Sequence, residues 1–313
     1  MRAIGVTEYG GPEALHELDV PAEDLGPHQV RLRVATAAVN PTDTGLRSGM
    51  RDESTAAPPP GAVPGMDVAG TLVEVGDRVE GLAEGDRVMG IVVPDGPHGG
   101  YREDLVLSAR SVTPVPDSLS DAEAASLPMN GLTAMLALDL LGLEPGQVLA
   151  VTGAAGAFGG YVVQLAKAQG LTVVADAKEG EEELVRGLGA DVVVPRGEGV
   201  TRAVLAEFPD GVDGLADGSL QGADVLPMVE EGGAVATVRG YQGDGSRGLR
   251  VHPVWVRDAA ERRDWLDELV RLTVAGQVTP RVADVLPAAE APEAHRRLEA
   301  GGVRGRLVLD FTV

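Results

Sequence analysis

The stretch VTGAAGAFGGYVVQLAKAQG, residues 151–170, constrains the fold more than any other part of the chain. It runs from an apolar strand pattern through a glycine cluster, Gly153, Gly156 and Gly159, into a helix pattern. In a dinucleotide-binding turn, one glycine permits the tight turn, another admits a pyrophosphate close to the backbone, and a third lets the helix pack on the sheet. The helix that follows offers free N–H groups to phosphates. A structural turn without a ligand is the alternative.

The second half of the chain alternates strand and helix patterns around this turn. Strands are expected at 148–153, 171–176, 191–195, 212–217, 233–238 and 249–256. Helices are expected between them at 159–169, 181–188, 201–208 and 219–231. Strands joined by helices imply right-handed crossovers, so the pattern predicts an α/β fold with a doubly wound parallel sheet. A glycine turn after the first strand of such a run favours dinucleotide binding over a purely structural turn.

The first hundred residues have a β pattern instead. Residues 30–39 alternate, with Val30, Leu32 and Val34 on one face. Further strands are expected at 69–75, 85–93 and 101–107, separated by Gly, Asp and Pro turns. Together they predict a small antiparallel barrel, interrupted by an exposed proline-rich loop at 51–62. The end of the chain predicts an amphipathic helix at 258–275, a short helix at 292–300 and a last strand at 306–311.

Length, charge and the start of the chain limit the classes of protein that fit. At 313 residues the chain exceeds the ~250–300 residues that one core usually supports, so two domains are expected. A formal net charge of −22 opposes nucleic acid or anionic membrane as the main partner. Residues 145–166 are uncharged, but Pro145 and five glycines divide them into strand, turn and helix patterns. With no signal-peptide pattern after Met1, a soluble cytoplasmic protein is expected.

Motifs along nearly the whole chain match one protein family. They are AVNPTDTGLRSGM (38–50), PGMDVAGTLVEVGDRV (64–79), GDRVMG (85–90), GGY (99–101), EAASLPMNGLTA (123–134), GAAGAFGGYVVQLAKAQG (153–170) and LGAD (188–191). In these motifs the chain resembles the medium-chain dehydrogenase/reductases, in particular the zeta-crystallin-like quinone oxidoreductases. The resemblance implies a GroES-like antiparallel β-barrel domain, discontinuous over 1–121 and 255–313, and a Rossmann dinucleotide-binding domain over 122–254. It also implies an active site in the cleft between the two domains.

The side chains do not predict a metal site. Zinc-dependent members of the superfamily use Cys, His and carboxylate ligands, but this chain has no cysteine and its five histidines lack ligand spacing. Asp67 stands where zinc enzymes carry a glutamate, and a single carboxylate makes no site. Substrates that accept hydride without a Lewis acid, namely quinones and activated enones, are therefore favoured over alcohols.

The resemblance implies catalytic roles for a few residues. Asn40, in NPTD, is expected near the nicotinamide with Asp43 beside it, where its amide could stabilise a developing oxyanion. A turn-capping role for Asn40 is the alternative. Several members of the family carry a tyrosine, the candidate proton donor, where this chain has Arg51, and some quinone reductases carry another tyrosine where Gly45 stands. Tyr241 and Tyr101 are possible substitutes, with a structural role as the alternative for both. The missing tyrosine favours quinones, whose reduced oxygens take protons from water, or an enone that is protonated by solvent.

The predicted cofactor is NADPH, with NADH as the alternative. The expected cofactor-binding residues are Asn40, Asn130, Thr133, Gly153, Gly156, Ala157, Phe158, Gly159, Asp176, Lys178, Arg196, Val238 and Arg239. Asp176, 20 residues beyond Gly156, favours NAD because a carboxylate there accepts bonds from the ribose hydroxyls. Lys178 and Arg196 favour NADPH because two cations can bind a 2′-phosphate.

Three functions remain open from the sequence. The first is an NADPH-dependent, zinc-free reductase of quinones or related electron-poor carbonyl compounds. The second is an enone or enoyl reductase of a metabolic or biosynthetic pathway, and the third is a weakly active nucleotide-binding protein with a structural or sensing role. A homodimer joined through the strand at 249–256 is expected, because that apolar strand lies at the end of the sheet.

Overall fold

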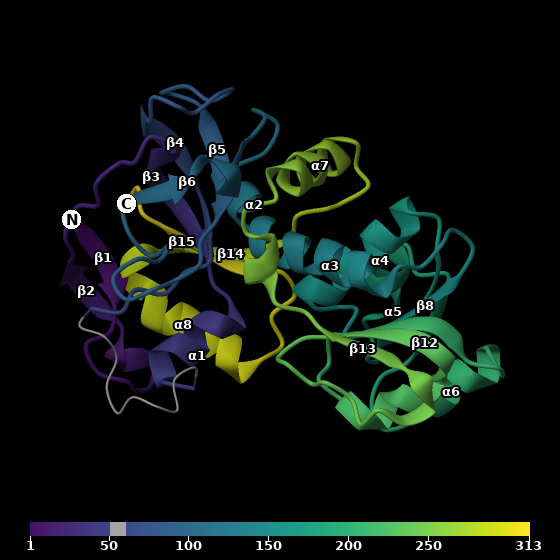
Figure 1. The fold of residues 1–313 in the computed structure, drawn as a ribbon. Coiled ribbons are helices and arrows are strands. Elements are labelled where there is room, and N and C mark those ends of the chain that lie inside the picture. The colour runs from purple at the N-terminus through teal and green to yellow at the C-terminus, as the bar shows by residue number, and fades with distance from the viewer. Residues whose placement is uncertain (51–60) are drawn as a thin grey trace. The chain divides into compact units, whose positions relative to one another are not determined.

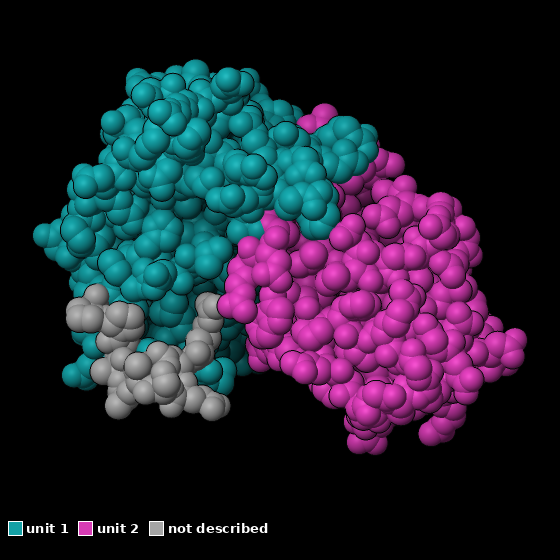
Figure 2. All heavy atoms as spheres, in the orientation of Figure 1, with its two compact units in different colours: residues 1–129, 260–271, 280–313 teal, residues 130–259, 272–279 magenta. Residues whose placement is uncertain are grey.

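The computed structural model describes residues 1–50 and 61–313 and divides the chain into two compact units, coloured in Figure 2. Unit 1 comprises Met1–Met129, Ala260–Arg271 and Pro280–Val313, and unit 2 comprises Asn130–Ala259 and Leu272–Thr279. The first unit is mainly antiparallel sheet and the second is a parallel α/β sheet, so the predicted fold class is confirmed. Apart from Gly61 and Ala62, the loop expected at 51–62 lies outside the described residues.

Unit 1 is built on a seven-stranded sheet with the order β14-β15-β3-β4-β5-β7, with β6 also pairing to β3. The strands are β3 (Gln29–Ala38), β4 (Asp67–Val75), β5 (Arg87–Ile91), β6 (Asp104–Ser108), β7 (Val112–Pro114), β14 (Val282–Pro287) and β15 (Arg306–Asp310). Strand β15 pairs antiparallel with β3, so the end of the chain completes the sheet that the beginning starts. A separate antiparallel pair is formed by β1 (Arg2–Gly5) and β2 (His16–Asp19).

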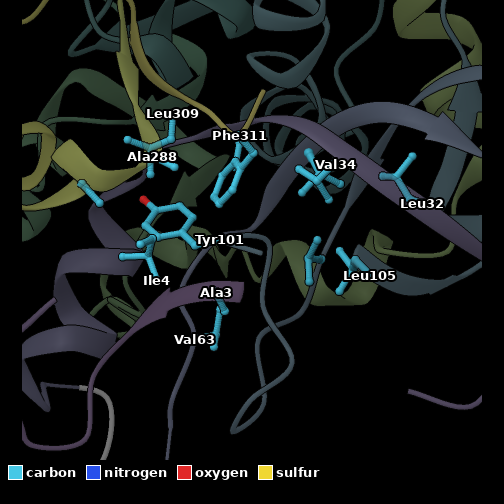
Figure 3. Close-up of a cluster of buried hydrophobic side chains, with 14 of the residues drawn as sticks. Ala3, Ile4, Leu32, Val34, Val63, Tyr101, Leu105, Ala288, Leu309 and Phe311 are labelled. Carbon is cyan, nitrogen blue, oxygen red and sulfur yellow. The ribbon is translucent and has the colours of Figure 1, made fainter. Parts of the chain in front are cut away.

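Four α-helices lie wholly or mostly in the described part of unit 1. They are α1 (Pro41–Ser48), α2 (Asp121–Ala125), most of α7 (Arg263–Val274) and α8 (Ala291–Ala300). Asn40 precedes α1, Pro41 occupies its first turn, and the helix ends at Gly49, whose φ of 80° is left-handed. The core of the unit includes Tyr101, which Figure 3 shows among Ala288, Leu309 and Phe311.

Unit 2 contains a six-stranded, all-parallel sheet with the order β10-β9-β8-β11-β12-β13. Its strands are β8 (Val148–Thr152), β9 (Thr172–Ala177), β10 (Val192–Pro195), β11 (Val212–Asp217), β12 (Val229–Thr237) and β13 (Arg250–Pro253). The connecting helices include α4 (Ala157–Ala168), α5 (Glu182–Gly187) and α6 (Val200–Glu207), and α3 (Pro128–Leu141) leads into β8 (Figure 1). The strand order reverses between β8 and β11, and open α/β sheets bind ligands at such a switch point, beyond the carboxyl ends of the strands.

One predicted helix of unit 2 is wrong. The segment 219–231 contains only a 3-10 turn over Gly222–Met228, after which β12 starts at Val229. Pro227 lacks an N–H and would clash within a longer α-helix, which explains the early end. Among the described residues, no helix is long and apolar enough to cross a membrane.

Candidate functional site

The glycine turn lies at the carboxyl end of β8, and its three glycines have different local environments. Gly153 has a φ of 71°, which a residue with a side chain rarely adopts. A Cβ on Gly159 would lie 2.4 Å from the carbonyl oxygen of Gly153. Helix α4 therefore approaches the turn too closely for any residue other than glycine at position 159. Gly156 is extended and a Cβ there would meet only that same oxygen, at 3.0 Å. Internal packing therefore requires Gly153 and Gly159 more strongly than Gly156, as expected if Gly156 is kept small for a ligand.

Asp176, near the end of β9, is almost fully buried and lies against this turn. The N–H of Ala154 donates to its Oδ1 at 3.0 Å, while its Oδ2 has no hydrogen-bond partner among the described residues. Burial raises the pKa of this carboxyl, and the bonds from Ala154 and Gly153 and the charge of Arg196 oppose that shift. Only 1% of the residue is exposed. In this structure the carboxylate thus supports the glycine turn from below.

Two cations follow the strands beside Asp176. Arg196 comes directly after β10, with its Nε 3.7 Å from the Oδ2 of Asp176 and its side chain 30% exposed. Lys178 follows β9 and is exposed. Because β9 and β10 are paired in parallel, both residues lie at the carboxyl edge of the sheet, on the same side of β8. Solvent-facing cations at this edge are suited to bind an anionic group on a ligand.

A second buried carboxylate, Asp217, lies at the end of β11 on the other side of β8. It accepts hydrogen bonds from the hydroxyl of Thr152 at 2.7 Å and from the backbone N–H groups of Ser219 at 3.1 Å and Gly222 at 2.9 Å. The loop after β11 is thereby held to the strand that precedes the glycine turn. Sequence reasoning did not identify Asp217, although an acidic residue ending a buried strand pattern was a usable signal.

The remaining predicted residues of unit 2 lie at the start of helix α4, in the segment after β12 and on helix α3. Ala157 and Phe158 open helix α4 and are half-buried, while Val238 and Arg239 follow β12, with Arg239 exposed. Tyr241 is half-buried, packs on the apolar core of the unit and accepts a bond through its carbonyl oxygen from Thr237 at 2.6 Å. Asn130 and Thr133 are buried, three residues apart on helix α3.

In unit 1 the structure brings Asn40 and Asp43 together with two residues from other strands and turns. Asn40 donates through Nδ2 to Asp67 Oδ2 at 2.8 Å and to the carbonyl oxygen of Ala38 at 3.3 Å, and it is fully buried. Asp43 accepts from the N–H of Asn40 at 2.7 Å and from the hydroxyl of Tyr101 at 3.1 Å. The amide hydrogens of Asn40 are therefore already donated within unit 1. A direct contact of this amide with substrate stays a prediction.

The electrostatics of this buried cluster are unusual because acids outnumber the nearby cation. Burial raises the pKa of Asp43 and of Asp67 to about 6, and the charge of Arg306 opposes both shifts. Arg306 is itself 4% exposed, and its Nη2 lies 3.8 Å from Asp67 Oδ2. Burial also lowers the pKa of His295 to about 3, with Arg47 adding to the effect, so His295 is neutral where its Nε2 meets the Tyr101 hydroxyl at 3.2 Å. Sequence patterns gave no sign of the Tyr101–His295 contact, which joins residues 194 positions apart.

Two family models match the chain. The alcohol dehydrogenase GroES-like domain matches residues 26–117, in unit 1, and the zinc-binding dehydrogenase model matches residues 188–309. Together the matches cover almost all of the seven-stranded sheet of unit 1 and strands β10 to β13 of the sheet in unit 2.

Full-length and partial relatives agree with these matches. The 2-methylene-furan-3-one reductase of Solanum lycopersicum is 37% identical over 248 residues, 77% of this chain, and the chain spans only 62% of that protein's length. The quinone oxidoreductase of Mus musculus is 30% identical over 336 residues, covering 99% of this chain and 97% of that protein. A crystal structure of an NAD-dependent alcohol dehydrogenase is 31% identical, with a TM-score of 0.86 and 99% of both chains covered.

The zinc named in the second family model does not fit the side chains present. The chain has no cysteine, and the described residues contain no group of three or more His, Asp or Glu residues able to hold a metal ion. Asp67, the carboxylate expected at the zinc position, accepts a hydrogen bond on each oxygen, from the side chain of Asn40 and from the N–H of Met129. A nicotinamide dinucleotide, in contrast, fits the glycine turn, where Gly156 leaves space and helix α4 begins.

Proposed function

The chain belongs to the medium-chain dehydrogenase/reductase superfamily, as a zinc-independent quinone oxidoreductase-like member, and we propose that it is an NADPH-dependent reductase of quinones or related electron-poor carbonyl compounds. The observation that carries the proposal is the end-to-end match to a quinone oxidoreductase, combined with a glycine turn that retains the geometry for a pyrophosphate. The bound nicotinamide would supply the hydride. The residues of unit 2 would hold the dinucleotide.

The choice of NADPH rests on the carboxyl edge of the sheet in unit 2. Asp176, the residue that would read the ribose hydroxyls of NAD, is turned beneath the glycine turn and is 1% exposed. Arg196 and Lys178 remain at the edge with solvent-facing side chains. Two cations of this kind contribute about 1.5–3 kcal/mol each to binding a 2′-phosphate through charge-assisted hydrogen bonds.

An enone or alkenal reductase is the second candidate. The tomato relative, whose name describes reduction of a 2-methylene-furan-3-one, favours this function. Over the region it shares with this chain, it is more similar in sequence than the mouse quinone oxidoreductase is. A weakly active nucleotide-binding protein is the third. Reduction of an enone requires a proton on carbon, whereas a reduced quinone takes protons on oxygen from water. The place of Arg51, where relatives carry a tyrosine, lies outside the described residues.

Stopped-flow oxidation of NADPH separates these functions. The substrates are benzoquinone, phenanthrenequinone and a panel of enones, each tested with NADPH and with NADH. Faster turnover of the quinones supports the first function, faster turnover of an enone supports the second, and tight NADPH binding without turnover supports the third. The catalytic contributions of Asn40, Asp43 and Tyr241 are tested in the same assay by substitution.

We also propose that the enzyme is a cytoplasmic homodimer joined through β13. This strand is at the edge of the six-stranded sheet, and an uncovered edge invites pairing with a second strand. Trp255, two residues after β13, is 45% exposed and offers apolar surface beside that edge. Light scattering at micromolar concentration tests the state, and a monomer would contradict it.

A further inference from the structure

Unit 1 contains a cavity of about 280 Å³ that is separate from every residue considered so far for catalysis or cofactor binding. All of its lining residues belong to unit 1. Half of them are apolar, namely Ile91, Val93, Val106, Leu107 and Ala260. Ligand pockets usually measure about 300–1,000 Å³ and combine apolar walls with a few polar groups, so a cavity of this size suits a small molecule.

One edge of the His98 ring, which lines this cavity, is fixed by Glu23. The Nδ1 of His98 lies 2.8 Å from Glu23 Oε1, which also accepts from Nη1 of Arg102 at 2.9 Å, and Glu23 Oε2 accepts from the N–H of Val106 at 3.0 Å. Although burial opposes the shift, these bonds and the charge of Arg102 hold the pKa of Glu23 below its ordinary value. Because a carboxylate only accepts hydrogen bonds, the Nδ1 of His98 carries a proton and donates it.

The other ring nitrogen of His98 is left for a ligand. The backbone of His98 is fixed as well, since it exchanges two hydrogen bonds with Asp95, at 2.8 and 2.9 Å. Glu23 does not line the cavity, so the Nδ1 edge of the ring is turned away from it and the edge that carries Nε2 faces it. Nε2 has no hydrogen-bond partner among the described residues, and in a neutral ring that donates through Nδ1 it is an acceptor.

Ser111 supplies a second unused polar group in the cavity. It is 7% exposed, and its hydroxyl makes no hydrogen bond within the described part of the chain. In contrast, Gln29 Oε1 and Ser108 Oγ each already accept a backbone N–H. The carboxylate of Glu261 is mostly exposed and lies 3.8 Å from Nε of Arg110, which offsets its charge. The cavity therefore presents one acceptor and one hydroxyl, without an uncompensated charge.

We propose that this cavity is a second binding site, which takes a small neutral phenol. The phenol hydroxyl donates to Nε2 of His98, its oxygen accepts from the hydroxyl of Ser111, and its ring packs on the apolar walls. A phenolic O–H is a stronger donor than an aliphatic one, and it also accepts, so it matches both unused groups. An anion gains no proton from a neutral imidazole nitrogen, and a cation meets a carboxylate that Arg110 already offsets. This site does not depend on the proposed reductase activity.

The test titrates the full chain, without cofactor, with phenol, toluene, benzoate and benzylamine. The NMR resonances of the histidine Cε1–H groups report binding, because the chain has five histidines and that of His98 is the one missing from the His98→Phe variant. His98→Gln serves for this assignment if the phenylalanine variant does not fold. Phenol is expected to shift the His98 resonance saturably. Toluene, which lacks the hydroxyl, should bind at least about fivefold more weakly, and the two charged probes should also bind more weakly than phenol.

Ser111→Ala is expected to weaken phenol binding about fivefold at the same resonance, because one hydrogen bond is lost. Ser48→Ala is the matched control and should leave the affinity unchanged, since the hydroxyl of Ser48, also in unit 1, donates to the carbonyl oxygen of Gly45 at 3.3 Å and does not line the cavity. Four results would each overturn the proposal: no shift of the His98 resonance with phenol, toluene binding as tightly as phenol, tighter binding of benzoate or benzylamine, and full affinity in Ser111→Ala.

Discussion

The Nε of Arg196 lies 3.7 Å from the Oδ2 of Asp176, and that oxygen is buried and accepts no hydrogen bond among the described residues. The pair reconciles two sequence signals that point to different cofactors. The acid that would select NAD is turned inward, and the cation beside it keeps a 30% exposed side chain. The charge of Asp176 still opposes a phosphate bound at Arg196.

Asp176→Asn is therefore expected to tighten NADPH binding. Asparagine retains an oxygen that accepts the Ala154 N–H, while it removes a charge whose repulsion of a nearby phosphate is about 1 kcal/mol, or about fivefold in Kd. NADH binding should change little. Titration of nicotinamide fluorescence measures both affinities. A loss of NADH affinity in this variant would instead identify Asp176 as a ligand of the ribose.

Lys178→Ala should remove most of the preference for NADPH, which we expect to be at least about tenfold in kcat/KM for the unsubstituted enzyme. Arg196→Ala should act in the same direction. The matched control is Lys167→Ala, because Lys167 is the other lysine of the chain and its Nζ is bound to Asp191 at 2.7 Å. A preference for NADH in the unsubstituted enzyme would contradict this assignment.

Gly156→Val should abolish cofactor binding while the fold persists, because the side chain would occupy the space where the backbone approaches the pyrophosphate. Gly159→Ala should mainly lower the Tm, since its Cβ would lie 2.4 Å from the Gly153 oxygen. Fluorescence titration and thermal unfolding separate the two effects. Native affinity in a folded Gly156→Val protein would make the turn purely structural.

The sequence was sufficient for the parallel sheet because its strands are short apolar runs that end in polar residues. It was sufficient for the glycine turn because Gly153 and Gly159 are required by local geometry alone. The directions in which side chains point could not be predicted from the sequence. The pattern places Asp176 at the end of β9, but only the packed structure turns its carboxylate toward Ala154. Likewise, the pairing of β15 with β3 brings Arg306 near Asp67, a relation with no local signature.

Asn40→Ala should lower turnover by roughly ten- to a thousandfold if the amide stabilises a reduced substrate oxygen, with cofactor affinity nearly unchanged. The hydrogen bond to Asp67 adds a second expectation, a lower Tm, because the variant leaves a buried carboxylate oxygen without its donor. Measuring kcat and Tm together distinguishes the roles. A large fall in Tm with kcat unchanged would restrict Asn40 to positioning α1 and β4.

The buried acids of unit 1 predict how stability depends on pH. Burial raises the pKa of Asp43 from 3.8 in the unfolded chain to about 6, so the folded state holds the proton to higher pH. Between about pH 4 and 6 the folded state binds more protons than the unfolded one, and stability contributed by this group falls as pH rises. The asparagine of the Asp43→Asn variant cannot ionise, so this variant does not lose stability in this way as the pH rises. The free energy of unfolding of the unsubstituted protein, relative to that of Asp43→Asn, should therefore fall across this window by on the order of 2 kcal/mol.

Urea unfolding at pH 4.5, 5.5, 6.5 and 7.5 measures this difference. Asp191→Asn is the control, because the pKa of Asp191 is shifted in the opposite direction to that of Asp43. Although burial opposes the shift, bonds from Lys167 and Val173 lower the pKa of Asp191 below 3.8. Its contribution is therefore complete above the unfolded pKa and is lost only at lower pH, so the difference between the unsubstituted protein and Asp191→Asn should be nearly constant from pH 5.5 to 7.5. A constant difference for Asp43→Asn as well would mean that Asp43 is ionised throughout, with Arg306 compensating its burial in full.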